Sequence, residues 1–376
     1  MTPLTKRLLI VLFPISLLIP SASLLLPVTP SEIDNRRLVA PEFSFEVLFD
    51  PLFYKEWLAY VRDANPVREL LIKVGVGLDY HLLNESPNPG EVLLGDEGWL
   101  YRRRTFDNLC DQSVVNVVSQ LEALVTEIES HGGLVVYTVV PHKFAITPEF
   151  LKSDQLVLAS CGMEGDKRLR AELAATAHPG YVDSWVLFES LKENGTEPFF
   201  RTDTHFNYRG SIPWMQALLT KIEPGLWDPD AVIDQGSVDF EGNLAKIIVP
   251  GVTEKTSKSI IDRGLNREPA EQLHDRISLT ETATESYRAD AVGVPLIEGE
   301  TVMLRDSFMN LPAPSFAQYF RDISFMDWRS DDSVSYFLQR ARHAEVTLIE
   351  IAAEAIFPRL TDDTLVHAFR GSAEGP

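Results

Sequence analysis

Cysteine is scarce in this sequence, since the 376 residues include only Cys110 and Cys161. Neither belongs to a C-x-x-C pair or to a zinc-like spacing, which argues against a thiol redox centre and a structural zinc site. In an oxidising compartment two such cysteines can form a disulfide, and closing a loop of about 50 residues would stabilise the fold by about 4 kcal/mol in the chain-entropy model. Two buried free thiols are the alternative, and the sequence does not separate the two.

Positive charge is also in short supply. The chain has 34 Lys and Arg against 55 Asp and Glu, a formal net charge of −21. Such a surface repels phosphate backbones, so we expect no nucleic-acid partner, and a strongly anionic substrate is disfavoured. The eight histidines show no H-E-x-x-H or similar metal spacing, and there is no Walker A or dinucleotide-binding fingerprint. We therefore expect neither a metal nor a cofactor.

The N-terminal 30 residues differ from the rest of the chain. Lys6 and Arg7 precede a long uncharged stretch, so the cationic start should stay in the cytoplasm while the following chain is exported. Residues 8–19 suit the apolar part of a cleaved signal peptide, followed by small residues. Alternatively, residues 8–26 are long enough to cross a bilayer. We expect residues 1–30 to be a signal anchor or a signal peptide.

The remaining chain divides by pattern. Residues 31–90 read as a juxtamembrane helical region, and 91–104 as a β-hairpin. Strands then alternate with helices, which predicts an α/β domain over 91–376: a three-layer sandwich around a mostly parallel sheet. Residues 222–295, rich in turns and charges, read as an insertion. The expected strands cover 134–141, 180–188, 301–308 and 343–351, and the expected helices cover 113–133, 165–176 and the residues that follow the loop at 203.

A serine ends one of these strands. In T-V-M-L-R-D-S-F the apolar residues form a strand, and Ser307 follows it, at the edge where sites form in parallel sheets. A neutral hydroxyl needs a base to become a nucleophile. His205 is a candidate base, and Asp203 is placed to orient it, because residues two apart in an extended segment point to one side. Taken separately, Asp203-x-His205 is also compatible with a polar turn, and Asp306-Ser307 with a helix cap.

Four segments of the chain resemble one family in the order found there. T-D-T-H-F-N-Y-R-G is similar to the D-T-H-W-N…G block of the SGNH-hydrolase-like polysaccharide O-acetyltransferases of the alginate O-acetylation type, the AlgJ and AlgX proteins. L-R-D-S-F resembles their G-D-S-F block. L-L-G-D-E-G-W-L-Y-R-R resembles their G-x-D-G-W-L-F segment, and V-V-P-H-K-F-A-I-T-P-E-F-L their V-P-x-K-x-x-I-Y-P segment. The blocks span residues 91 to 310.

The resemblance implies an SGNH-hydrolase-like fold and an acyltransferase in which Ser307 is the nucleophile, His205 the general base and Asp203 its orienting partner. The implied reaction moves an acetyl group through an acetyl-serine intermediate onto hydroxyls of an exported polysaccharide, with a membrane-bound O-acyltransferase as the partner that relays the acetyl donor. The implied location is the periplasm, either anchored to the inner membrane or secreted. A glycan acetyl esterase and a catalytically silent scaffold subunit of an exopolysaccharide assembly are the alternatives.

Three positions bear on specificity. Arg305 stands where the family has glycine before Asp-Ser, which predicts an altered oxyanion site or an added cationic contact. Phe206 replaces the family's tryptophan and keeps an aromatic ring. Lys143 follows an expected strand and is a candidate to hold a substrate carboxylate or carbonyl, with an exposed surface cation as the alternative. We therefore expect Lys143 and Arg305 to bind substrate.

Overall fold

The computed structural model separates the chain into two compact units, Met1–Pro87 and Asn88–Pro376. Within the first unit, α2 (Pro51–Asp63) is a helix and η3 (Asp79–Leu83) is a wide helical turn; both lie in the region expected to be helical. The candidate export segment at 1–30 lies outside the described residues. Across the part of the chain that the structure describes, no helix has the length and apolar character needed to span a membrane. The structure describes residues 50–63, 74–110, 113–249, 251–265, 269–270, 284–289, 293–360 and 362–371.

The second unit is built on a seven-stranded sheet with the order β4-β3-β11-β9-β10-β8-β7. The five strands from β4 to β10 are parallel to their neighbours, whereas β8 and β7 are antiparallel. The fold is therefore an α/β fold with a mixed, mostly parallel sheet, as predicted. The strands are β3 (Leu134–Val140), β4 (Tyr181–Val182), β7 (Pro269–Ala270), β8 (Thr284–Arg288), β9 (Ile297–Arg305), β10 (Phe320–Asp327) and β11 (Val346–Ala352).

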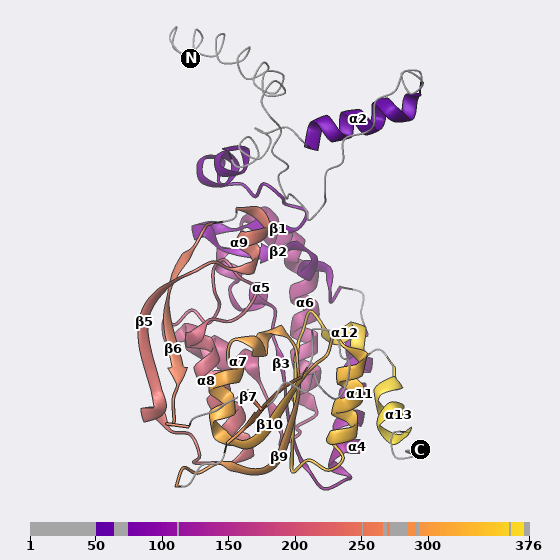
Figure 1. Ribbon diagram of the computed structural model, residues 1–376, viewed down its shortest axis with the longest axis vertical. Helices are drawn as coiled ribbons and strands as arrows, with labels where there is room; N and C mark the ends of the chain where they lie inside the picture. The colour runs from indigo at the N-terminus through magenta and orange to yellow at the C-terminus, as the bar shows by residue number, and fades with distance from the viewer. Residues whose placement is uncertain are drawn as a thin grey trace. The chain divides into compact units, whose positions relative to one another are not determined.

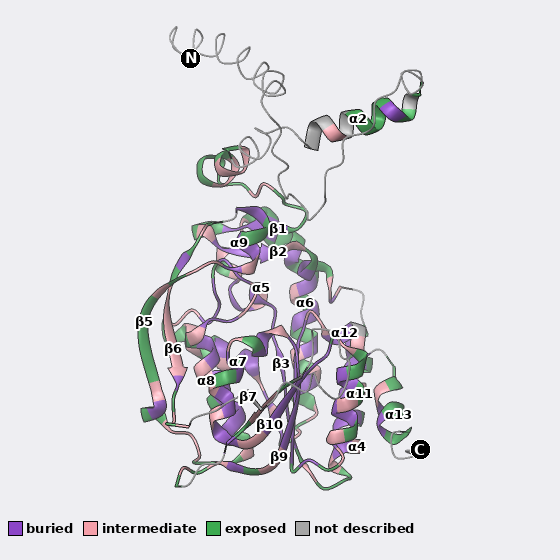
Figure 2. Ribbon diagram, viewed as in Figure 1, coloured by how far each residue is buried: buried purple, intermediate pink, exposed green. Residues whose placement is uncertain are grey.

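Helices cover both faces of this sheet (Figure 1). One layer contains α4 (Val114–Glu129), α11 (Asp331–Arg340) and α13 (Thr364–Gly371), and the other contains α7 (Ser184–Glu193) and α8 (Tyr208–Ile222). All seven residues of β11 are buried, as are six of the seven in β3, so the centre of the sheet reads as continuous apolar runs. Figure 2 shows these central strands as buried.

One expected strand is wrong beyond its first residues. Residues 180–188 were expected to form one strand, but only Tyr181–Val182 pairs with β3, and α7 begins at Ser184. The side chain of Asp183 caps this helix by accepting a hydrogen bond from the Val186 N–H at 3.0 Å. The apolar run W-V-L-F has the composition of a strand, but the side chain of the preceding aspartate stabilises the start of a helix here.

The region expected to be an insertion contributes a long antiparallel hairpin. Its strands are β5 (Val232–Phe240) and β6 (Glu254–Ile261), and the short helix α9 (Asn243–Ile248) lies between them. Most of β5 is exposed, as Figure 2 shows, whereas β6 packs against α8. The same stretch of sequence also supplies β7 and β8 to the edge of the main sheet.

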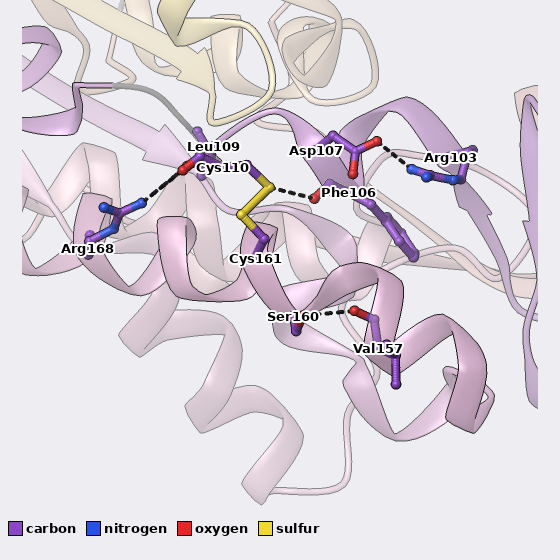
Figure 3. The surroundings of a disulfide bond; sticks show 9 residues. All are labelled: Arg103, Phe106, Asp107, Leu109, Cys110, Val157, Ser160, Cys161 and Arg168. Atoms are coloured by element: carbon purple, nitrogen blue, oxygen red, sulfur yellow. Dashed lines mark hydrogen bonds and ion pairs between the residues drawn. A yellow bond between two sulfur atoms is a disulfide. The ribbon is translucent and has the colours of Figure 1, made fainter.

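Cys110 and Cys161 form a disulfide, which resolves the choice that the sequence left open. It links the turn after η5 (Arg103–Asp107) to the long helix α6 (Ser153–Ala175), as Figure 3 shows. The two segments pack closely because α6 carries glycine at the contact: a Cβ on Gly162 would lie 2.2 Å from the Phe106 carbonyl oxygen. In the same contact, Arg168 Nη2 donates to the Leu109 carbonyl at 3.4 Å.

Candidate active site

Asp203, His205 and Ser307 form a continuous hydrogen-bonded chain. His205 Nε2 lies 2.9 Å from Ser307 Oγ, and His205 Nδ1 lies 2.6 Å from Asp203 Oδ1. The histidine is separated from the serine by 102 residues along the chain. The structure thus brings together the three residues that sequence reasoning selected, in the geometry that a serine nucleophile, a general base and an orienting carboxylate require.

Asp203 is fixed by more than His205. Its Oδ1 also accepts the His205 backbone N–H at 3.0 Å, and its Oδ2 accepts the Asn243 backbone N–H at 2.6 Å. The Asn243 side chain then brackets Thr204: Oδ1 accepts the Thr204 N–H, and Nδ2 donates to Thr204 Oγ1. Gly242 permits this approach, because a Cβ there would lie 2.1 Å from the Thr202 carbonyl oxygen. The first residue of α9 therefore holds the turn that carries Asp203 and His205.

These contacts keep Asp203 ionised. Burial by itself would raise the pKa of the Asp203 carboxyl, but hydrogen bonds from His205 and from the Asn243 N–H hold that pKa below its usual value. A charged Asp203 fixes the His205 tautomer with Nδ1 protonated and leaves Nε2 free to accept the Ser307 proton.

Ser307 begins the short helix η9 (Ser307–Asn310) directly after β9. Asp306 precedes it and caps η9, because its Oδ1 accepts the Phe308 N–H at 2.8 Å. Its Oδ2 accepts the Ala352 N–H at 2.7 Å, and its own N–H donates to Glu350 Oε2 at 2.9 Å. The helix cap that the sequence offered as an alternative is thus present together with the contact between Ser307 and His205. Hydrogen bonds to Glu350 and Ala352 of β11 hold the capping residue in place.

The ammonium of Lys143, which the sequence suggested as a substrate-binding group, is hydrogen-bonded to the backbone. This group is buried and donates to three backbone carbonyl oxygens, those of Leu100 (2.8 Å), Arg201 (2.9 Å) and Asp203 (2.9 Å). An ammonium has three donors, so these bonds use all of them. Lys143 therefore ties β2 (Leu100–Arg102) to the Asp203 segment and has no donor left for a substrate.

Arg305 is likewise used internally. The side chain is buried, and Nη1 donates to Asn310 Oδ1 at 2.5 Å and to the Asp306 carbonyl oxygen at 3.3 Å. Nη1 also lies 3.7 Å from Asp327 Oδ2, and Asp327 is the register partner of Arg305 on β10. The arginine that replaces the family's glycine is thus explained by a cross-strand ion pair and a contact with η9. The expected contact with substrate does not fit this burial.

A small pocket with a cavity volume of about 20 Å³ lies beside the triad, and we call it the Phe308 pocket. Phe308 and Thr204, the chain neighbours of Ser307 and His205, both contribute to its wall. The Phe308 ring packs edge-on against His205, with ring centres 4.7 Å apart. The rest of the wall mixes apolar and polar side chains, which are Val140, Phe144, Leu244 and Ala352 on the one hand and Arg102, Thr105, His142, Lys143 and Glu354 on the other.

Sequence reasoning missed Asn243 and Glu350. Asn243 falls in the stretch set aside as an insertion, and only the Gly-Asn pair at the start of a short helix marks it. Glu350 is a single charged residue inside the apolar β11 pattern, and an isolated acid in a fully buried strand was a usable sign of a partner nearby. Within the described residues, no group of three or more His, Cys, Asp or Glu side chains is arranged to hold a metal ion.

Comparisons with known proteins agree with the motifs. Residues 92–231 match the family described as "SGNH hydrolase-like domain, acetyltransferase AlgX", which confirms the predicted resemblance. No curated protein sequence matches the chain. Bacillus cereus PatB1 with a sulfonyl adduct is similar in fold, with 13% identity and a TM-score of 0.50 over 69% of this chain and 93% of that one.

Two further solved structures are similar at lower scores. The O-acetyltransferase domain of Pseudomonas putida AlgJ has 17% identity and a TM-score of 0.47 over 75% of this chain and 99% of that one. Pseudomonas aeruginosa AlgX has 15% identity and a TM-score of 0.48 over 76% of this chain and 67% of that one. The family match and the PatB1 likeness support an SGNH-hydrolase-like α/β fold.

Proposed function

We propose that this chain, with an AlgX-like acetyltransferase domain over residues 92–231, is a serine O-acetyltransferase that acetylates hydroxyls of an exported polysaccharide. The observation that carries the proposal is the 2.9 Å contact between His205 Nε2 and Ser307 Oγ, with Asp203 behind the imidazole. A hydroxyl so placed can pass its proton to a base as it attacks a carbonyl.

The reaction runs in two steps. In the first, Ser307 Oγ attacks the acetyl carbonyl carbon of the donor while His205 Nε2 takes the serine proton. The leaving group departs with that proton, and an acetyl ester remains on Ser307. In the second, His205 Nε2 takes the proton of a sugar hydroxyl, and the sugar oxygen attacks the acetyl carbon. Ser307 Oγ leaves and recovers the proton. Asp203 stabilises the imidazolium in both steps.

The surroundings support an acetyl group as the transferred unit. The apolar side chains in the wall of the small Phe308 pocket suit a methyl group. The backbone N–H of Ser307, at the first position of η9, has no preceding helical turn to bond with and is the proposed oxyanion donor. The chain itself needs no cofactor for these steps.

An acetyl esterase would use the same residues, with water as the acceptor. The side chain of His205 is 21% exposed, so solvent reaches the base and hydrolysis competes with transfer. A partition experiment separates the two: acetyl-enzyme formed from p-nitrophenyl acetate is offered increasing amounts of a polysaccharide acceptor. A transferase gives acetylated polymer at the expense of acetate. Acetate formation that is unchanged by the acceptor would contradict the transferase and favour the esterase.

Whether Ser307 is a nucleophile at all is tested separately. A sulfonyl fluoride should label the wild-type chain at Ser307 and fail to label Ser307→Ala. Equal labelling of both proteins would remove the basis for covalent catalysis and favour the scaffold alternative.

The proposal also includes location and partner. Lys6 and Arg7 ahead of the apolar N-terminal stretch support export to the periplasm, with residues 1–30 as a retained anchor or a cleaved signal peptide. Acetyl donors of the cytoplasm do not reach that side, so a membrane-bound O-acyltransferase is the proposed relay. A reporter that is active only outside the cytoplasm, fused after Pro376, should be active. Activity of a reporter that requires the cytoplasm would contradict the location.

A further inference from the structure

A second cleft, with a cavity volume of about 330 Å³, lies between the chain around residues 197–209 and the β5–β6 hairpin. We call it the hairpin cleft. Its wall shares no residue with the wall of the Phe308 pocket, so the two are distinct. Its size is that of a ligand site rather than a surface irregularity. The segment that forms one wall also carries Asp203 and His205, so the cleft and the triad share a structural element.

The wall of the hairpin cleft mixes hydrogen-bond donors with acceptors. Arg201, Arg209 and Lys255 are exposed cations, and Glu97 is an exposed acid. Arg209 Nη2 donates to Ser257 Oγ at 3.0 Å, and the other donors of this guanidinium have no protein acceptor among the described residues. A hydroxyl group both donates and accepts, so alternating donors and acceptors suit a ligand with many hydroxyls.

Glu197 adds an unsatisfied acceptor to this wall. Its Oε2 is buried and has no hydrogen-bond partner in the described part of the chain. Burial raises the pKa of this carboxyl above its usual value, and Glu149 and Glu97 add to the effect against the pull of Lys192. An unpaired buried oxygen costs stability, and a ligand hydroxyl that donates to it would recover that cost.

An aromatic pair forms another part of the wall. Phe150 stacks on the buried ring of Trp99 with centres 4.4 Å apart and planes 8° apart, and Phe150 itself is only partly buried. A sugar ring has apolar C–H groups on its faces and hydroxyls at its rim. A partly exposed aromatic ring beside hydrogen-bonding side chains matches both features.

Charge decides which class of glycan fits. The cleft wall carries three cations and three carboxylates, so no large excess of either sign is present. Glu254 is already paired within the protein, because Oε1 accepts from Thr202, Oε2 accepts the Arg201 N–H, and Arg201 Nε lies 3.8 Å from Oε2. With a net charge of −21 on the whole chain, a polyanionic polymer is repelled. We propose that the hairpin cleft binds a run of uncharged sugar residues in the acceptor polysaccharide. This inference rests on the acetyl transfer proposed above.

The test is direct binding to a chain that cannot turn over. The full-length protein with Ser307→Ala is titrated calorimetrically with cellohexaose and with mannohexaose, and an oligouronate hexasaccharide serves as the anionic comparison. We expect saturable binding of at least one neutral hexasaccharide and none of the uronate. Adding Arg209→Gln and Lys255→Gln should weaken binding at least about tenfold. Lys258→Gln, on the same strand but outside the cleft wall, is the matched control and should bind normally.

Each other outcome contradicts the inference. Binding of neither neutral hexasaccharide rejects the class of ligand, tighter binding of the uronate rejects the charge argument, and full affinity in the Arg209→Gln, Lys255→Gln protein rejects the location. Because binding is measured without catalysis, the two proposals fail separately. If the protein binds the glycan but never transfers acetyl, the inference about the cleft stands and the proposed function is rejected. If the protein transfers acetyl but the cleft variant binds the glycan with unchanged affinity, the proposed function stands and the inference about the cleft is rejected.

Discussion

Glu350 on β11 and Asp306, directly after β9, form a buried carboxyl pair next to Ser307. Glu350 Oε2 accepts the Asp306 backbone N–H at 2.9 Å, and both side chains are buried. Burial raises the pKa of both carboxyls, and the proximity of Asp306 raises that of Glu350 further. Two close carboxylates in an apolar interior do not both ionise readily, so burial of the pair disfavours its fully ionised state.

Glu350→Gln should remove a pH-dependent contribution to stability. The folded chain keeps the Glu350 proton above pH 4.5, where the unfolded chain releases it. That contribution is therefore complete below pH 4.5 and declines as the pH rises through the raised folded value. The variant keeps an oxygen acceptor for the Asp306 N–H, so we expect similar stability at pH 4 and a relative gain at pH 7, about 1.4 kcal/mol for each unit of raised pKa.

Urea unfolding of both proteins across this pH range measures the difference. Asp203 and Asp327, whose pKa values are lowered, lose their contributions in acid in both proteins and cancel in the comparison. A constant difference at all pH values would show that Glu350 does not titrate between the folded and unfolded states.

The triad should behave as one unit. Ser307→Ala and His205→Ala should each reduce acetyl turnover at least about 10³-fold, and the double variant should be little worse than either, because both changes disable the same step. Asp203→Asn should also reduce turnover, since an amide does not stabilise the imidazolium. Single losses that multiply in the double variant would contradict a shared mechanism. Activity should be unaffected by a chelator.

Lys143 should act as a positioning residue. Lys143→Met leaves three carbonyl oxygens without their donor, so we expect a loss of about 1–3 kcal/mol in stability and a fall in kcat, because the Asp203 carbonyl is one of the three. Lys167→Met, at an exposed site on α6, is the control.

A pH profile separates positioning from general instability. Burial lowers the pKa of Lys143 to about 7, with Glu254 and Asp203 opposing that effect. A neutral amine has one donor fewer, so wild-type kcat should decline above neutral pH with KM nearly constant. The variant's residual kcat should lack this decline. If kcat of Lys143→Met still declined above neutral pH as in the wild type, that decline would belong to the titration of another group.

The triad could be predicted because its parts are local in sequence. A strand with a serine at its end and a D-x-H pair are each readable over a few residues, and family resemblance joined them. The strands on either side of β9 run parallel to it, as the alternation of strand and helix patterns along the sequence predicted. The expectation that Lys143 binds substrate failed because it depended on contacts between distant segments. In the sequence a buried lysine looks the same as an exposed one, and the three carbonyl partners of Lys143 lie 43 to 60 residues away along the chain.

Arg305 shows the same limit. Beside the nucleophile motif it resembles a ligand for substrate, but its partner Asp327 becomes visible only when β9 and β10 are in register. Asn243 was missed because its role is to support the backbone of another segment, and such support leaves little trace in local sequence.

The disulfide should contribute measurably to stability. It closes a loop with a sequence separation of 51, for which the chain-entropy model predicts about 4 kcal/mol as an upper figure. Replacing Cys110 and Cys161 together by alanine should lower Tm and the urea midpoint, and a reductant should lower those of the wild type but not of the variant. Equal midpoints for the oxidised wild type and the variant would contradict a stabilising bridge.

The central claim is that an acetyl group resides on Ser307 between two transfers, and mass spectrometry of a trapped reaction tests it most directly. The full-length chain is mixed with p-nitrophenyl acetate, quenched in acid during turnover and digested. We expect a single added acetyl group on the peptide that contains Ser307, absent from Ser307→Ala and depleted when a polysaccharide acceptor is added before the quench. Acetyl on another side chain that turns over at the catalytic rate, or turnover that persists in Ser307→Ala, would contradict the mechanism.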